Sequence, residues 1–264
     1  MSEHEKSGVQ SVQRALQLLS MFAPHRLSQL QHRTSWSVSE LARATGLHKS
    51  IVARMMATMA SEGYLVQDSG TRQYSVGPQA FAVGLGYKPY TARSSVARPS
   101  MEALTQEVGH ASYLGVPAGA HYLLLLATES RVSVRVKIEM GERRRFHSGA
   151  IGKILLASMT DEAIRATIGS DPLPQLTPYT IASGEELSVQ IAEVRKTGIA
   201  FASQEAILGA SSIAVAISNT LGEVVAGLGL IYPSHLVSEA ELQVLITHTR
   251  RAGDEISRRI GWGI

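Results

Sequence analysis

The chain of 264 residues contains no cysteine. This absence excludes disulfide bonds, thiolate metal sites and cysteine nucleophiles, and it is typical of proteins kept in a reducing compartment. The sequence also lacks an apolar run of about 18 residues, so we expect no membrane-spanning helix. The N-terminus, MSEHEKSGVQ, holds no apolar segment, and we therefore expect no secretory signal and a cytoplasmic protein.

The composition is that of an ordinary globular protein, with 44% hydrophobic and 18% charged residues, and the length suits two domains. The positive charge is unevenly distributed. Residues 1–90 contain nine Lys or Arg against five Asp or Glu, whereas the remainder contains 16 basic and 17 acidic residues. A basic N-terminal third is compatible with nucleic-acid binding but is weak evidence by itself.

The N-terminal third shows a sequence of helix signals. Apolar residues recur at helical spacing over Val9–Phe22. Ser37 and Glu40 have the spacing of a capping box, which predicts a second helix, and Gly46 supplies a left-handed stop. A third helix is predicted over Ser50–Glu62, with its methionines facing the core.

Two short alternating segments follow, 64–67 and 73–77, around a polar tip that contains Gly70. This pattern predicts a β-hairpin. Helix, glycine turn, helix and hairpin, in this order, are typical of a winged helix-turn-helix. Pro78 can begin a further helix that reaches about Tyr87, and Lys88–Tyr90 is the expected break between domains.

The rest of the chain mixes the two kinds of element, which predicts an α+β domain with a mainly antiparallel sheet. The expected helices cover 92–108, 151–159, 161–168, 184–197 and 238–260. The expected strands cover 111–116, 121–128, 133–139, 199–203, 212–218 and 224–232.

A helix that enters the major groove of DNA reads base edges with the residues of its N-terminal end, and a wing probes the minor groove or phosphates. The N-terminal end of the preceding helix, at Ser37, offers free N–H groups to a backbone phosphate. Together these positions predict seven DNA-contacting residues: Ser37, Ser39, His48, Lys49, Ser50, Arg54 and Arg72. Any one of them is as easily an ordinary solvated side chain. The combined pattern favours DNA.

Several segments resemble the IclR family of bacterial regulators, and the resemblance covers nearly the whole chain. The segments that carry it are SVQRALQLL (11–19), SVSELARATGLHKSIVARMM (37–56), EGYLVQDSGTRQYSVG (62–77), SGAIGKILLAS (148–158), KTGIAFASQEAILGASSIAVAI (196–217) and GEVVAGLGL (222–230). The resemblance implies a winged helix-turn-helix over 1–77, a linker helix over 78–90 and a GAF/PAS-like effector-binding domain over 91–264. It further implies a homodimer or homotetramer on a pseudo-palindromic operator, and we expect a repressor. We expect no cofactor and no metal, because the sequence offers neither cysteine nor paired histidines to hold zinc.

Carried over by position, the resemblance also implies a pocket for a small effector. Its expected residues are Gly149, Ala150, Ile151, Ala202, Ala210, Ser212, Gly229 and Ile231. Because Ala202, Gly229 and Ile231 are apolar or lack a side chain, we expect a larger and less polar ligand, such as an aromatic or hydrophobic acid. Arg143, Arg144 and Arg145 either form a solvated turn, which is the favoured interpretation, or place a guanidinium (Arg144 in our assignment) against a ligand carboxylate.

An enzyme and an interaction module without ligand control are the two alternative classes of function. An enzyme has no visible machinery, because the sequence contains neither a G-x-S-x-G elbow nor H-E-x-x-H, and Lys153 lacks the spacing of a phosphate loop. His110, His121 and His147 are expected to be structural or surface residues. A winged-helix module that binds nucleic acid or protein without ligand control is the remaining alternative.

Overall fold

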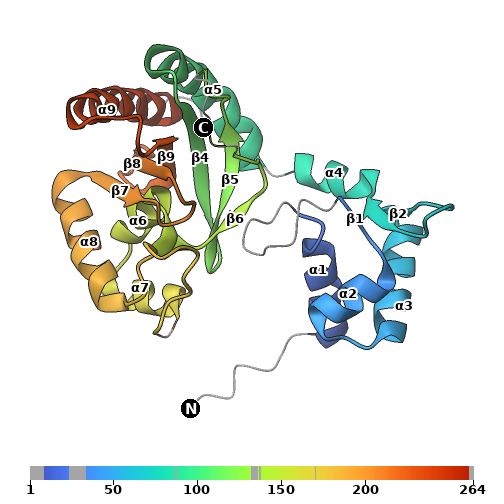
Figure 1. Cartoon of the computed structure of the whole chain (residues 1–264). Helices are drawn as coiled ribbons and strands as arrows, with labels where there is room; N and C mark the ends of the chain where they lie inside the picture. The colour runs from blue at the N-terminus through green and yellow to red at the C-terminus, as the bar shows by residue number, and fades with distance from the viewer. Residues whose placement is uncertain are drawn as a thin grey trace. The chain divides into compact units, whose positions relative to one another are not determined.

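The computed structural model describes residues 9–23, 34–86, 88–131, 136, 138–169 and 171–261. The chain divides into two compact units, Met1–Lys88 and Pro89–Ile264, each with its own core. Figure 1 labels their helices and strands. None of the described helices is long and apolar enough to cross a bilayer.

Within its described residues, the first unit combines four helices with a small antiparallel sheet of strand order β1-β3-β2. The helices are α1 (Gln10–Ser20), α2 (Val38–Thr45), α3 (Lys49–Ser61) and α4 (Pro78–Leu85). The strands are β1 (Ser35–Trp36), β2 (Leu65–Gln67) and β3 (Tyr74–Val76). Their buried side chains form one cluster around Leu18, Leu41, Val52, Met56 and Leu65. Helix, turn, helix and hairpin therefore occur in the predicted order.

Local interactions account for both ends of α2. The Ser37 amide donates to Glu40 Oε2 over 2.9 Å, and the Glu40 amide donates to Ser37 Oγ over 3.3 Å, which confirms the capping box. Gly46 adopts φ +68°, the left-handed conformation expected of a helix stop. Strand β1 was not predicted. It has two residues, and its partner β3 lies almost forty positions away in the sequence, with Trp36 opposite Tyr74.

The second unit is built on a six-stranded, wholly antiparallel sheet in the order β6-β5-β4-β9-β8-β7. The strands are β4 (Ala111–Ala118), β5 (His121–Ala127), β6 (Arg143–Arg144), β7 (Ile199–Ser203), β8 (Ala210–Ser218) and β9 (Val224–Pro233). The expected α+β class is confirmed.

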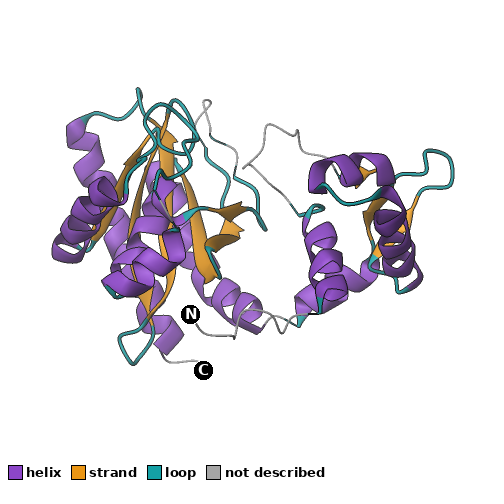
Figure 2. Ribbon diagram, turned by 90° about the horizontal axis from the view of Figure 1, so that it is seen from below, coloured by secondary structure: helices purple, strands orange, loops and turns teal. Residues whose placement is uncertain are grey.

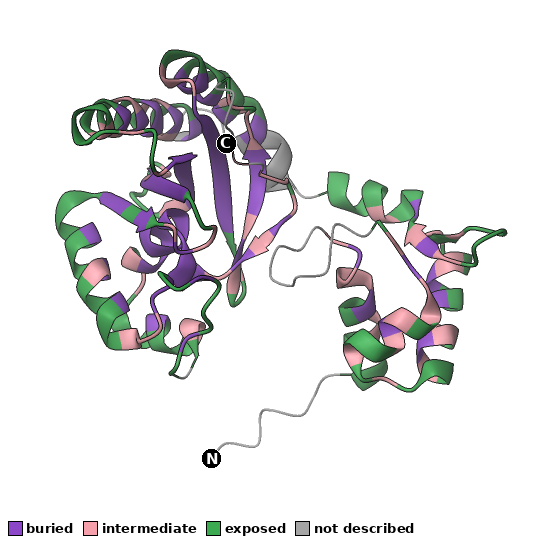
Figure 3. Ribbon diagram, viewed as in Figure 1, coloured by how far each residue is buried: buried purple, intermediate pink, exposed green. Residues whose placement is uncertain are grey.

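Helices cover both faces of this sheet (Figure 2). Helices α5 (Lys88–Val108) and α9 (Glu239–Gly261) pack on one face through a cluster that includes Met101, Leu104 and Ile256. Helices α6 (Ala150–Ala157), α7 (Asp161–Ile168) and α8 (Gly184–Thr197) lie on the other, in a cluster with Ile154, Ile164 and Leu187. The short 3-10 helix η2 (Phe146–Ser148) precedes α6. The central strands are consequently buried on both faces (Figure 3).

Two local expectations need correction. Of the strand predicted over 133–139, the described residues Val136, Ile138 and Glu139 are not in a strand, and the others lie outside the described residues. The edge strand is instead β6, at Arg143–Arg144, which pairs with β5. Helix α5 begins at Lys88 rather than near residue 92, because proline is tolerated in the first turn of a helix.

Candidate functional site

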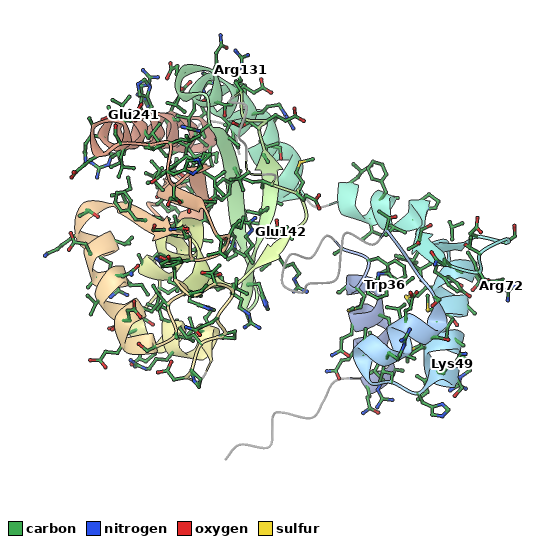
Figure 4. The ribbon with its side chains drawn as sticks, in the orientation of Figure 1. Trp36, Lys49, Arg72, Arg131, Glu142 and Glu241 are labelled. Carbon is green, nitrogen blue, oxygen red and sulfur yellow. The ribbon has the colours of Figure 1, made fainter. Side chains whose placement is uncertain are left out.

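Helix α3 exposes the residues that were predicted to face DNA. His48, Lys49, Ser50 and Arg54 are all exposed, whereas Val52 and Met56 of the same helix are fully buried. Ser50 and Arg54 are four residues apart and therefore share one face of the helix. Figure 4 shows Lys49 at the beginning of α3. One polar face of α3 is thus available to a partner.

Helix α3 begins at Lys49, one residue before the predicted start. His48 occupies the cap position, and its Nδ1 accepts the Ser50 amide over 3.4 Å. The same nitrogen lies 2.8 Å from Ser50 Oγ. His48 therefore satisfies a backbone N–H that the first turn leaves free, and its ring is held at the entering end of the helix.

The beginning of α2 carries Ser37 and Ser39, also predicted to meet a phosphate. Ser37 is half-buried in the capping box, and Ser39 is exposed. The Glu40 carboxylate also accepts the Ser37 hydroxyl, over 2.8 Å. A negative charge therefore lies at this helix N-terminus and opposes phosphate binding there, although it stabilises the helix itself.

The hairpin between β2 and β3 presents Arg72 at its tip (Figure 4). Asp68 Oδ1 organises the turn by accepting the Thr71 amide over 2.6 Å and the Gly70 amide over 3.1 Å. These hydrogen bonds, that from Thr71 first, lower the pKa of Asp68. Arg72 is exposed and adopts φ +58°, which is uncommon for a residue with a side chain. A basic side chain therefore occupies a position that glycine would occupy more easily.

A small internal cavity lies in the second unit, among strands β4, β6, β7, β8 and β9 and the start of α6. Its lining residues are Tyr113, Arg144, Ser148, Gly149, Ala202, Glu205, Ala206, Ile207, Ala210, Ser212 and Ile231. The free volume at its centre is about 10 Å³, the space of about one water molecule. A larger ligand therefore needs the wall to move, and three residues of the wall, Glu205, Ala206 and Ile207, lie in a segment (204–209) that has neither helix nor strand.

Six of the nine residues predicted for the pocket line this cavity, namely Gly149, Ala202, Ala210, Ser212, Ile231 and Arg144. The other three are placed elsewhere. Ala150 is fully buried in the core, and Ile151 packs against the backbone of Gly115 and Gly227. At Gly229 a Cβ atom would lie 2.5 Å from the Tyr113 ring. The space above Gly229 is therefore filled by tyrosine, and the missing side chain does not enlarge the cavity as we had expected.

Arg144 is buried, so the interpretation of residues 143–145 as a solvated turn is wrong for this residue. Its Nη2 donates to Glu142 Oε2 over 3.0 Å, and both side chains are at most 8% exposed. Burial opposes the charge of Arg144, but the neighbouring Tyr122 and Glu142 raise its pKa. Burial in turn raises the pKa of Tyr122 above its ordinary range. Arg144 thus presents a fixed positive charge to the cavity.

A second buried ion pair joins Lys153 to Glu205, and Glu205 lines the cavity. Lys153 Nζ donates to Glu205 Oε1 and to Gln190 Oε1, each over 2.6 Å, and to the Phe201 carbonyl over 2.8 Å. Lys153 is fully buried. Burial lowers its pKa and raises that of Glu205, and each charge opposes the shift of the other.

Lys153, Glu205, Tyr113 and Ser148 were absent from the predicted site. Lys153 did carry a signal, because a lysine inside the apolar run AIGKILLA of α6 requires a buried partner. Glu205 carried none, since it lies fifty-two residues further along the chain from Lys153 and the fold alone brings the two together.

Known proteins share both units. Residues 11–69 match the IclR helix-turn-helix domain, and residues 93–258 match the family described as bacterial transcriptional regulator IclR C-terminal. The HTH-type transcriptional regulator XynR of Escherichia coli is 27% identical over 254 residues, which are 96% of this chain and 98% of XynR.

Solved structures agree. A crystal structure of an IclR transcriptional regulator from Silicibacter sp. TM1040 superposes with a TM-score of 0.82 at 27% identity, covering 95% of this chain and 96% of that one. An IclR homologue from Microbacterium hydrocarbonoxydans, complexed with 4-hydroxybenzoate, has a TM-score of 0.78 at 23% identity and covers 95% of this chain and 98% of its own. The chain therefore belongs to the IclR family of bacterial transcriptional regulators.

Proposed function

We propose that this regulator binds a pseudo-palindromic operator through α3 and the β2–β3 hairpin, and that a small acid in the second unit controls its affinity for DNA. The observation that carries the proposal is that α3 exposes one face, which holds Ser50 and Arg54, while its opposite face packs into the core. Lys49 and Arg72 add positive charge that can neutralise phosphates. His48 and Ser39 complete the proposed contacts, whereas the amide and hydroxyl of Ser37 are already engaged by Glu40.

The effector site is proposed at the cavity between Arg144 and Glu205. A guanidinium with a fixed charge suits a carboxylate ligand, and Ala202, Ala210 and Ile231 supply apolar walls. The Microbacterium homologue, whose structure contains 4-hydroxybenzoate, supports an aromatic acid as the first ligand to test. We infer binding rather than catalysis, because the ionic groups that line the cavity are held in ion pairs.

We also propose a homodimer or homotetramer that acts in the cytoplasm, with 1–77, 78–90 and 91–264 as DNA-binding domain, linker and effector domain. Two helices of the first unit expose apolar side chains that a second copy could cover. These are Val12 and Leu16 of α1, and Phe81, Val83 and Leu85 of α4. Two copies would place two α3 helices on the two half-sites of an operator.

The experiment that tests this function is a mobility-shift assay on the DNA upstream of the protein's own gene, repeated with 4-hydroxybenzoate and with aliphatic acids. We expect a sequence-specific shift that a bound acid changes by about 5- to 150-fold in affinity. Ala202→Asp should abolish the response to the acid and leave the shift itself intact. A reporter assay then decides between repression, which we expect, and activation.

The narrowness of the cavity favours a second candidate, a DNA-binding module without ligand control. In that case every acid would leave the mobility shift unchanged. Absence of any shift on duplex DNA would instead overturn the proposed operator contacts.

A further inference from the structure

Of the two oxygens of the Glu205 carboxylate, one accepts a hydrogen bond from Lys153 and the other differs from it. Oε1 receives Lys153 Nζ, whereas Oε2 is buried and has no hydrogen-bond partner within the part of the chain that the structure describes. Glu205 is 6% exposed and is one of the residues that line the cavity. A buried acceptor without a donor costs about 1–3 kcal/mol, so such a group calls for an explanation.

Lys153 cannot supply the missing donor. The ammonium group of Lys153 has three N–H bonds, and Glu205, Gln190 and Phe201 accept all three. Lys153 therefore fixes the position of the carboxylate but has nothing left to give a ligand. Because its charge is already matched by Lys153, Oε2 can accept a hydrogen bond without needing a second cation.

The backbone of Glu205 is equally well held. Its carbonyl accepts Thr180 Oγ1 over 2.6 Å, and the carbonyl of Gln204 accepts Thr177 Oγ1 over 2.7 Å. The acceptor is therefore placed by side chain and backbone together. A binding group that is held in this way selects ligands by geometry, because it does not have to be ordered when the ligand arrives.

Arg144 lines the same cavity with the opposite charge, and it is held by Glu142 as Glu205 is held by Lys153. The two ion pairs together are neutral. A ligand that satisfies both lining groups needs a hydrogen-bond acceptor, such as a carboxylate, for Arg144 and a hydrogen-bond donor for Glu205.

We propose that Glu205 is a specificity-determining residue of the effector site, and that the effector is a hydroxy acid whose hydroxyl group donates to Glu205 Oε2. This inference rests on the proposed effector site. It adds a requirement that an aromatic or hydrophobic acid alone does not meet, since benzoate and propionate carry only an ionised carboxylate, which accepts hydrogen bonds, and no donor.

The test compares ligands that differ in one donor. Isothermal titration calorimetry of the full chain would measure 4-hydroxybenzoate against benzoate and 4-methoxybenzoate, and lactate against propionate. In any set that binds, we expect the hydroxy acid to bind at least about tenfold more tightly than its partners, because the partners leave Oε2 without a donor. The methoxy compound keeps the oxygen and removes only the donor.

The decisive variant is Glu205→Gln. With Lys153 still bonded to the amide oxygen, the amide nitrogen takes the place of Oε2 and donates, so 4-methoxybenzoate should bind as well as 4-hydroxybenzoate. Glu142→Gln makes the same chemical change in the other ion pair and should keep the preference for the hydroxy acid. Should Glu205→Gln fail to fold, Glu205→Asp retains the charge beside Lys153 and withdraws the carboxylate from the cavity, and it should also lose the preference.

Equal binding within the sets by the unchanged protein overturns the proposal, as does a preference that survives in Glu205→Gln. If the acids bind and alter DNA affinity but the hydroxyl makes no difference, the effector site stands and the role of Glu205 alone falls. If no acid of any set binds while the operator shift persists, both ligand control and this inference are wrong.

Discussion

Lys153 Nζ lies 2.6 Å from Glu205 Oε1, in a pair whose side chains are 0% and 7% exposed. Removing one member of such a pair leaves a buried charge without compensation, which costs about 3–5 kcal/mol. We therefore expect Lys153→Met to lower the free energy of unfolding of the second unit by about this amount. Urea denaturation followed by circular dichroism measures it.

The double variant Lys153→Met with Glu205→Leu is the matched control. It removes both charges, so we expect much of the lost stability to return. If the double variant is as unstable as Lys153→Met, the loss comes from packing rather than from the unpaired carboxylate.

Arg54 should contribute to sequence-specific binding. Its exposed position on the same face as Ser50 predicts that Arg54→Ala weakens operator binding by about 1–3 kcal/mol, with a smaller loss on a scrambled duplex. Fluorescence anisotropy on both duplexes measures the difference. Arg165→Ala removes the same charge from an exposed position of α7 and should leave both affinities unchanged. An unaltered operator affinity in Arg54→Ala would remove this residue from the interface.

Replacing Arg72 by glycine should have opposite effects on the stability of the fold and on the affinity for DNA. Because its φ is +58°, Arg72→Gly relieves an unfavourable backbone conformation, and we expect thermal stability to stay the same or rise. DNA binding should weaken on all sequences, and its dependence on salt should lose about one unit of slope if the side chain contacts a phosphate. Arg72→Lys should retain most of the affinity. A normal salt dependence in Arg72→Gly would show that the hairpin tip does not touch DNA.

Stability of the second unit should fall as the pH is lowered. Burial lowers the pKa of His147, against an opposing hydrogen bond to the Pro174 carbonyl, and the positive charges of Arg145 and Lys153 add to the lowering. Between the lowered pKa of His147 and the ordinary histidine value of about 6.5, the unfolded chain therefore binds more protons than the folded one. In this pH range the stability decreases as the pH falls.

His147→Gln keeps a donor for Pro174 and removes the titrating group, so its melting temperature should depend less steeply on pH below about 6.5. Some dependence should remain, because burial also lowers the pKa of His110. Differential scanning calorimetry across this range measures both slopes. Identical slopes for the variant and the unchanged protein would contradict the assignment to His147.

The sequence predicted most of the elements because their signals are local. The Ser37–Glu40 capping box, the stop at Gly46 and the apolar strands 199–203 and 224–232 each depend on neighbouring residues, and the structure places elements there. The cavity was harder to predict. Gly229 appeared to open space, yet the Tyr113 ring from a neighbouring strand fills it. Arg144 appeared solvated, yet β6 buries it beside Glu142. The contact of Tyr113 with Gly229 and the pairing of β6 with β5 join distant segments and leave no periodic signal.

The two threonine hydroxyls that bond to the Gln204 and Glu205 carbonyls have a mechanical consequence. They couple the wall of the cavity to the segment 176–180, where Tyr179 is exposed. If Glu205 shifts to admit a ligand, either these hydrogen bonds break or the segment moves with it. Binding of a ligand in a cavity with room for about one water molecule would then be detectable at the protein surface, as a change in the solvent exposure of the Tyr179 ring.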